Sequence, residues 1–340
     1  MTFQKALCFD DVLLVPRHWS GGSRKEVDIS TRIAGVPLEL PIISANMPSV
    51  SGLDMAVALD NAGGMSIFDR LCPIEEQVQK ALEFRKISPT GLVGGSIGIG
   101  QDALEDAKKL IDAYVDLICI DVAHGDQRDC EYTLEQFRSK FRKFPVIVGN
   151  FAAPPRPRFA DLLKFDHFAW KLGVGSGASC TTRIQTGCGL PTLQSIFEFR
   201  NTSGDIIADG GIKNAGDCVK SLAAGAGAVM LGSLLAGTTE APGSIIKDDK
   251  TGQKYKVYRG NASAGSKIQA GLRQEFVEGA EMLVKFKGSV DDVLAQLEDG
   301  IRSGFTYCGA RTLPDLQSSA KFMEVSAAGQ KENLPHGIFG

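Results

Sequence analysis

Short apolar segments recur eight times in the first two thirds of this 340-residue chain, and most are separated by stretches with helical character. They cover residues 40–46, 64–68, 91–97, 117–123, 145–150, 167–174, 205–210 and 228–232. The helical stretches between them include residues 53–61, 74–84, 103–114, 132–141 and 215–224. Apolar strands that alternate with helices are typical of a parallel sheet covered by helices. Eight strands predict an α/β fold of the closed (β/α)8 TIM barrel type.

A doubly wound open sheet is the alternative to the barrel. It is the weaker interpretation because no Gly-x-Gly-x-x-Gly sequence follows the first apolar segment, where a dinucleotide-binding sheet would carry one. No linker-like segment divides the chain, so we expect residues 1–340 to form a single barrel domain.

Residues 238–288 interrupt the alternation after the eighth strand. This segment is rich in Gly, Lys, Ser and Glu, and we expect a hairpin-like excursion with a mobile flap over the barrel mouth. A plain surface insertion would have the same composition and stays open. Residues 298–304 and 307–316 are expected to return to helix, followed by a polar tail.

Composition narrows the class of protein. The chain is 43% hydrophobic and 23% charged, as expected for a globular domain with a sizeable core. A net charge of −3 gives no reason to expect a nucleic acid or an anionic membrane as partner. We expect no membrane span and no signal peptide. Eight cysteines without framework or zinc-ligand spacing suggest reduced thiols, no structural metal and a cytoplasmic location.

A glycine-rich loop at residues 173–189 presents a cysteine with polar neighbours. Three glycines precede this cysteine and three polar side chains follow it: Gly173, Gly175 and Gly177, then Thr181, Thr182 and Arg183 around Cys180. Glycine allows positive φ and close approach of the backbone to a ligand or ion. A thiol beside a cation and hydroxyl groups can be held partly as the thiolate, which attacks electrophilic carbon. An anion-binding turn with an inert, buried cysteine is the alternative.

Polar residues also end most of the other apolar strands. They are Asn46, Asp121, His124, Asn150, Asp209-Gly210-Gly211 and Gly232-Ser233. The carboxyl ends of the strands form the active-site face of such a barrel, and the last two loops commonly hold phosphate through backbone N–H groups. We therefore expect a phosphorylated substrate. Asp121 and Asn150 could instead cap helices, and an ordinary loop position is the favoured interpretation of His124.

Several ordered motifs carry a family resemblance. They are residues 9–16 (FDDVLLVP), 41–47 (PIISANM), 120–125 (IDVAHG), 148–150 (VGN), the cysteine loop, 207–211 (IADGG), 231–237 (LGSLLAG) and 307–310 (YCGA). On these motifs the chain resembles the IMP dehydrogenase and GMP reductase family over nearly its whole length. The resemblance implies a purine nucleotide substrate whose C2 is attacked by Cys180, forming a thioimidate, while a nicotinamide cofactor exchanges hydride at that carbon.

The resemblance also assigns binding residues by motif. Those implied for the nucleotide are Asp209, Gly210, Gly211, Gly232, Ser233, Gly260, Asn261, Ala262, Arg273 and Gly279. Those implied for the cofactor are Asp121, Val122, Ala123, Gly173, Val174 and Gly175. A potassium ion is implied at Gly175, Gly177, Cys180 and Arg183, and a homotetramer is the implied assembly.

Two features favour the reductase within this family. Residues 84–90 pass directly into the third strand, without the regulatory modules that dehydrogenases commonly insert there. Residues 259–278 contain no Arg-Tyr pair, which dehydrogenases use to activate water. The resemblance then implies an NADPH-dependent GMP reductase, with Cys180 as nucleophile and Thr182 and Glu278 protonating the departing amine.

Other activities stay open. A dehydrogenase without regulatory modules would convert IMP to XMP with NAD. A reductase of a related purine nucleotide is suggested by departures from the family pattern at Pro48, Asn261 and Glu275. A relative that binds nucleotides without turnover is the non-catalytic alternative.

Overall fold

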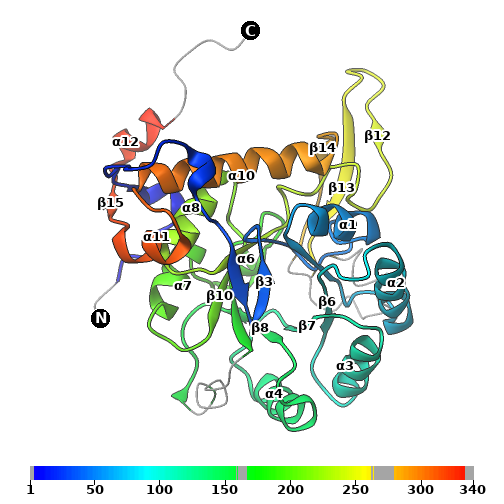
Figure 1. The fold of residues 1–340 in the computed structure, drawn as a ribbon. Helices are drawn as coiled ribbons and strands as arrows, with labels where there is room; N and C mark the ends of the chain where they lie inside the picture. Colours follow the sequence, from blue (N-terminus) through cyan, green and yellow to red (C-terminus); the bar gives the residue numbers. More distant parts are fainter. Residues whose placement is uncertain (1–3, 158, 160–166, 262, 264–278, 334–340) are drawn as a thin grey trace.

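Eight parallel strands close into a barrel in a computed structural model of the chain (Figure 1). The structure describes residues 4–157, 159, 167–261, 263 and 279–333. The barrel strands are β4 (Ile42–Ser44), β5 (Met65–Phe68), β6 (Val93–Ile97), β7 (Leu117–Asp121), β8 (Val146–Phe151), β9 (Phe168–Leu172), β10 (Asp205–Asp209) and β11 (Ala228–Leu231). Because β11 pairs in parallel with β4, the sheet has no open edge. The barrel prediction is confirmed, and the open sheet is excluded.

Helices pack on the outside of the barrel between successive strands. They are α1 (Leu53–Asn61), α2 (Ile74–Ile87), α3 (Ala103–Asp112), α4 (Arg128–Phe141), α7 (Thr192–Phe199) and α8 (Ala215–Ala224). Helix α4 begins four residues before the position predicted from the sequence. Its buried face already starts at Cys130 and continues through Leu134 and Phe137, at the spacing of one helical stripe.

The apolar core has two parts. The larger lies between the strands and the helices, and the smaller fills the inside of the barrel. A hairpin of β2 (Thr31–Ile33) and β3 (Val36–Leu38) adds its apolar side chains to the inner core. The N–H of Ala34, in its turn, donates to Asp205 at the first residue of β10. The hairpin therefore closes the amino-terminal end of the barrel, which leaves the carboxyl end for a site.

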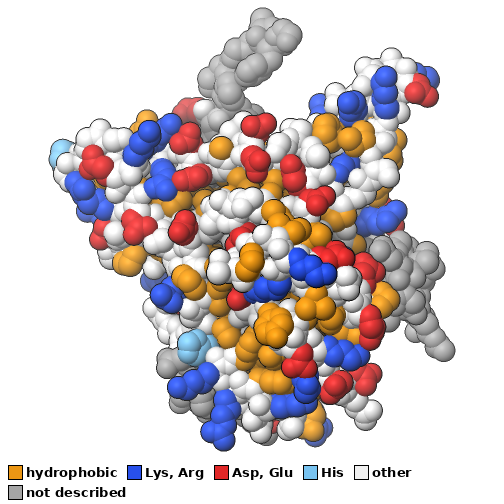
Figure 2. Space-filling model, turned by 45° about the vertical axis from the view of Figure 1, so that its right-hand side comes forward, with side chains coloured by type: hydrophobic (Ala, Val, Ile, Leu, Met, Phe, Trp, Pro, Cys, Tyr) orange, Lys and Arg blue, Asp and Glu red, His pale blue; other side chains and the backbone are white. Residues whose placement is uncertain are grey.

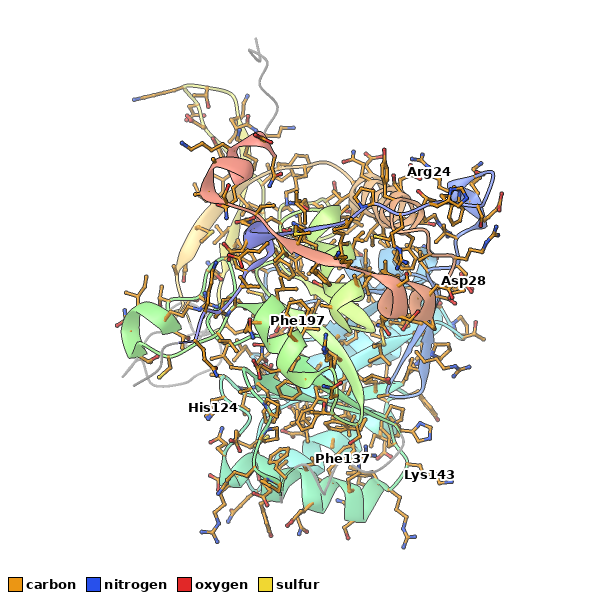
Figure 3. The ribbon with its side chains drawn as sticks, turned by 90° about the vertical axis from the view of Figure 1, so that its left-hand side faces the viewer. Arg24, Asp28, His124, Phe137, Lys143 and Phe197 are labelled. Atoms are coloured by element: carbon orange, nitrogen blue, oxygen red, sulfur yellow. The ribbon has the colours of Figure 1, made fainter. Side chains whose placement is uncertain are left out.

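The two ends of the chain are joined by a short antiparallel pair. Strand β1 (Val12–Leu14), which follows a short 3-10 turn η1 (Phe9–Asp11), pairs with β15 (Phe322–Glu324). Phe322 also packs edge-on against Phe197 of α7, with ring centroids 5.2 Å apart (Figure 3). The sequence predicts a polar tail here. Its described part contains β15, for which β1 supplies a partner from the other end of the chain, and the helix α12 (Ala327–Glu332), which has no buried residue.

The predicted C-terminal helices differ from the structure in extent. Residues 298–304 lie inside the longer α10 (Val290–Tyr307), and residues 307–316 do not form one helix. The chain turns through Gly309, which has a φ of +71°, before α11 (Leu313–Ser319) begins. A residue with that φ cannot continue a right-handed helix. Near the amino terminus, η2 (Arg24–Glu26) contacts α10.

After the eighth barrel strand, the chain forms a three-stranded antiparallel sheet of β12 (Ile246–Lys247), β13 (Lys254–Arg259) and β14 (Glu281–Lys285). Figure 1 shows β12 and β13 projecting from the barrel at the upper right. Figure 2 shows Lys and Arg side chains near the tip of this projection and hydrophobic side chains lower down. The exposed hydrophobic residues there are Ile245, Ile246 and Leu283. Among the described residues, no helix is both long and apolar enough to cross a membrane.

Candidate active site

A cavity of about 600 Å³ opens where the carboxyl ends of the barrel strands meet. The sequence-predicted residues that line it are Asn46, Asp121, Val122, Ala123, Asn150, Gly173, Gly175, Gly177, Cys180, Thr182, Arg183, Asp209, Gly210, Gly211, Gly232, Ser233, Gly260, Asn261 and Gly279. Val174 does not line it and is buried. Ala262, Arg273 and Glu278 lie outside the described residues.

The cysteine loop contains four glycines with a positive φ, Gly173, Gly175, Gly187 and Gly189. Gly173 has a φ of +154° and Gly175 a φ of +77°, whereas Gly177, a third candidate from the sequence, has no positive φ. A Cβ at Gly173 would lie 1.8 Å from the carbonyl oxygen of Asp209. The chain therefore passes so close to the end of β10 that no side chain fits.

Cys180 lies partly exposed at the cavity, just before the short helix α6 (Thr182–Thr186). Its Sγ is 3.1 Å from Oγ1 of Thr182. The backbone N–H of Cys180 donates to the carbonyl of Gly177 over 3.0 Å, which forms a tight turn ahead of the thiol. This cysteine therefore faces open space and a hydroxyl, which an inert core cysteine does not.

The excursion after β11 reaches back to the cysteine loop. Cys180 forms an antiparallel bridge with Gly279, and the N–H of Ala280 donates to the carbonyl of Ser179 over 2.8 Å. These residues lead into β14, which pairs with β13. The thiol is thus positioned from two sides, by the end of β9 and by the start of β14.

The loops after β10 and β11 form a cradle of backbone N–H groups. Gly210 and Gly211 have φ values of +86° and +78°. The N–H groups of Gly210, Gly211 and Ser233 donate to no described residue. Nζ of Lys287 donates to the carbonyls of Ser233 and Leu234 in the loop after β11. Open N–H groups at the start of a turn suit an anion such as phosphate.

Lys171 is a site residue that no sequence motif indicated. It lies in β9 and is 2% exposed, and its ammonium donates to Asp121 over 2.8 Å and to Asp209 over 3.3 Å. It also donates to the side-chain oxygen of Asn150. A lysine in the middle of an apolar strand was the available signal, because a charge is buried there only if it is paired.

The charges of this cluster reinforce one another. Burial alone would raise the pKa of Asp121, but Lys171 and Arg70 outweigh it and hold that pKa below its usual range. Burial alone would lower the pKa of Lys171, and the two carboxylates raise it above its usual range instead. The ion pair is therefore charged at neutral pH.

The structure decides two alternatives left by the sequence. The side chains of Asp121 and Asn150 bind Lys171, so neither serves as a helix cap, and α4 has Gln127 at its N-cap. His124 is exposed and does not line the cavity, which agrees with the interpretation as a loop histidine (Figure 3).

Three further cavity residues carry buried polar groups. Tyr258 of β13 is 3% exposed, and burial raises its pKa to about 12, so it stays protonated. Asn261 donates from Nδ2 to the carbonyl of Asn46 over 3.1 Å. Among the described residues, Oδ1 of Asn261 has no hydrogen-bond partner. A buried group without a partner is costly, so an acceptor is available here for a ligand.

Comparison with known proteins identifies the family. The family model described as the IMP dehydrogenase / GMP reductase domain matches residues 6–336. The inosine-5'-monophosphate dehydrogenase of Borreliella burgdorferi is 31% identical, with 99% of this chain and 98% of that protein covered. The enzyme of the same name from Aquifex aeolicus is 42% identical over 72% of this chain and 52% of that protein.

The dehydrogenase of Nitrosopumilus maritimus is 29% identical and covers 99% of both chains, in an alignment 477 positions long. This chain has only 340 residues, so that relative contains a large segment that this chain lacks. A crystal structure of a Cys→Ala variant of Trypanosoma brucei GMP reductase, in complex with guanosine 5'-monophosphate, superposes with a TM-score of 0.89. It is 26% identical, with 99% of each chain covered. The chain therefore belongs to the IMP dehydrogenase / GMP reductase family of oxidoreductases.

Proposed function

We propose that this protein is a GMP reductase, which uses NADPH to convert GMP to IMP and ammonia. The observation that carries the proposal is the Cys180–Thr182 pair, with Sγ 3.1 Å from Oγ1 at the edge of the cavity. A nucleophile beside a hydroxyl suits displacement of an amine, which must leave with a proton. The structural similarity to a GMP reductase that binds GMP supports this choice.

In the proposed reaction, the Cys180 sulfur adds to C2 of the guanine ring. The C2–N bond then breaks, and the amine leaves as ammonia after Thr182 and Glu278 relay a proton to it. NADPH, when bound, supplies the hydride that C2 gains as the carbon–sulfur bond breaks and the thiolate leaves. One GMP, one NADPH and two protons thus give IMP, an ammonium ion and NADP⁺.

The nucleotide would be held by the strand-end loops. We assign its phosphate to the open N–H groups of Gly210, Gly211 and Ser233. Oδ1 of Asp209 has no partner among the described residues and would accept a ribose hydroxyl. Asn261 and Gly279 line the cavity and belong to the excursion, and the motif also assigns Ala262 and Arg273 to the nucleotide.

The cofactor and the cation would be held by residues at the ends of β7 and β9 and in the loops that follow these strands. We assign the nicotinamide end to residues 121–123, at the end of β7, and to residues 173–175, which follow β9. The carbonyls of Gly175, Gly177, Cys180 and Arg183 would hold the potassium ion. Gly177 and Arg183 each accept one backbone hydrogen bond, and a carbonyl oxygen has a second lone pair free for a cation.

The domain and assembly are part of the proposal. We treat residues 1–340 as one catalytic unit, with residues 238–288 as its flap, and the assembly as a homotetramer. Light scattering after size-exclusion chromatography tests the assembly without reference to the activity.

The deciding experiment follows the absorbance of the reduced nicotinamide in two mixtures. With GMP and NADPH the absorbance should fall, and with IMP and NAD it should not rise. Cys180→Ala should abolish turnover while IMP still binds. Cys188→Ser is the matched control, because Cys188 is an exposed thiol of the same loop that does not line the cavity. Turnover that survives in the Cys180→Ala protein refutes the covalent mechanism.

An IMP dehydrogenase is the second candidate, and one observation favours it. The relatives reported above that share 29–42% identity all carry that name. A rise in reduced cofactor from IMP and NAD, with no oxidation of NADPH by GMP, would establish it instead. If neither mixture reacts but IMP binds, a panel of other purine nucleotides separates a different substrate from a non-catalytic relative.

A further inference from the structure

Lys171 uses its whole hydrogen-bonding capacity inside the protein. An ammonium group has three N–H donors. At Lys171 they go to three side chains: Asp121, Asn150 and Asp209. No donor is left for a ligand, although the residue borders the cavity. Its effect on any ligand must therefore pass through these partners.

The partners come from three different strands. Asp121 ends β7, Asn150 lies in β8 and Asp209 ends β10, while Lys171 itself is in β9. The lysine thus ties together the carboxyl ends of four neighbouring strands of the barrel. Two of its partners are the carboxylates that we assign to the cofactor and to the nucleotide.

The carboxylate of Asp209 is oriented by this arrangement. Its Oδ2 accepts from Lys171 over 3.3 Å and from Nδ2 of Asn150 over 2.8 Å. Nδ2 of Asn150 also donates to the carbonyl of Gly173 over 2.8 Å, which fixes the amide itself. Oδ1 of Asp209 has no partner among the described residues. Because two donors hold Oδ2, Oδ1 is left to accept a hydrogen bond from a ligand in the cavity that Asp209 lines.

We infer that Lys171 is a positioning residue, which aims the Asp209 carboxylate at the bound nucleotide and screens it from Asp121. This inference rests on the proposed function, because it takes Asp209 as a nucleotide ligand. The structural reason is that both carboxylates lie within 3.3 Å of the same nitrogen. Without that cation they would repel each other across a buried space.

The other polar groups around Lys171 do not replace it. Arg70 lies 3.7 Å from Asp121 and donates to its backbone carbonyl, so it serves only one of the two carboxylates. Cys119 of β7 is fully buried, and burial raises the pKa of its thiol, so it adds no charge at neutral pH. Asn150 is neutral. Lys171 is therefore the one positive charge that both carboxylates share among the described residues.

A double-mutant cycle on IMP affinity tests the inference, with binding measured by calorimetry at pH 8. Lys171→Met should weaken IMP binding about tenfold or more, because it leaves the Asp209 carboxylate without a cation and next to the Asp121 carboxylate. Asp209→Asn should also weaken it. The double variant should bind no more weakly than Asp209→Asn alone, because Lys171 acts through Asp209. Losses that multiply, or a Lys171→Met protein with wild-type affinity, overturn the inference.

The pH profile adds a readout that a merely structural role would not change. When Lys171 is removed, one of the two carboxylates should take up a proton near neutral pH. Relative to the wild type, Lys171→Met should then recover affinity as the pH falls from 8 to 6. The double variant should show no such recovery. A Lys171→Met profile parallel to the wild type would contradict the inference.

A control variant at another buried lysine tests whether the effect is specific to Lys171. Lys256 is a second buried lysine, 4% exposed, which donates to the carbonyls of Thr239 and Ala241 and does not line the cavity. Lys256→Met should leave the pH profile of IMP binding unchanged. If Lys171→Met does not fold, the comparison of Asp209→Asn with the double variant still decides. Failure of the wild type to oxidise NADPH with GMP, while IMP binds and the cycle behaves as expected, refutes the reductase assignment alone.

Discussion

Replacement of Gly173 by alanine should disrupt the site through backbone geometry alone. The new Cβ would lie 1.8 Å from the carbonyl oxygen of Asp209, whereas ordinary contacts between such atoms are about 3.5 Å or longer. The two segments must therefore separate by about 1.7 Å. That movement would break the hydrogen bonds that the same carbonyl accepts from Ser176 over 3.2 Å and from Thr192 over 3.3 Å.

The expected cost follows from these contacts. Two lost hydrogen bonds amount to about 2 kcal/mol, and the strained backbone at a φ of +154° adds about 1–3 kcal/mol. The free energy of unfolding should therefore fall by about 3–5 kcal/mol. Because Asp209 must move, IMP binding should be lost as well.

Gly187→Ala is the matched control for this prediction. Gly187 also has a positive φ, +71°, but its Cβ would meet nothing within 4 Å. This change should cost only the left-handed strain, about 1–2 kcal/mol, and should leave IMP binding intact. Urea denaturation followed by far-ultraviolet circular dichroism measures both variants. Equal losses of stability in the two would refute the steric argument.

Two further predictions concern the fold. Trp170→Ala should lower the free energy of unfolding by about 3–5 kcal/mol in calorimetric melting, because the Trp170 ring centroid lies within 5.1 Å of the ring centroids of Phe151, Phe168 and Phe199. Trp170→Phe should cost less. An equal loss in the two variants would count against ring packing as the cause. Burial raises the pKa of Asp205 in the folded protein. Above that pKa the buried charge lowers the free energy of unfolding. This penalty disappears as the pH falls toward the pKa that Asp205 has in the unfolded chain. Asp205→Asn keeps an acceptor for the Ala34 N–H, so it should be more stable than the wild type at pH 7 in urea denaturation. This difference in stability should shrink in acid. A variant that is less stable at pH 7 would show that the charge is not the dominant cost.

Local patterns in the sequence determined the main features of the fold and the position of the thiol. The eight apolar segments became barrel strands because burial on both faces leaves a continuous apolar run, which is visible without any tertiary information. The cysteine loop could also be recognised from the sequence alone, because the positive φ values found at Gly173 and Gly175 require glycine. Helix α8 was predicted at the residues where it occurs.

The tertiary structure alone decided which side chains act together. Lys171 meets partners 50, 21 and 38 residues away along the chain, and only closure of the barrel brings those strand ends side by side. Strand β15 depends in the same way on β1 at the opposite end of the chain. Such pairings are set by the register and order of strands, which short-range periodicity does not encode.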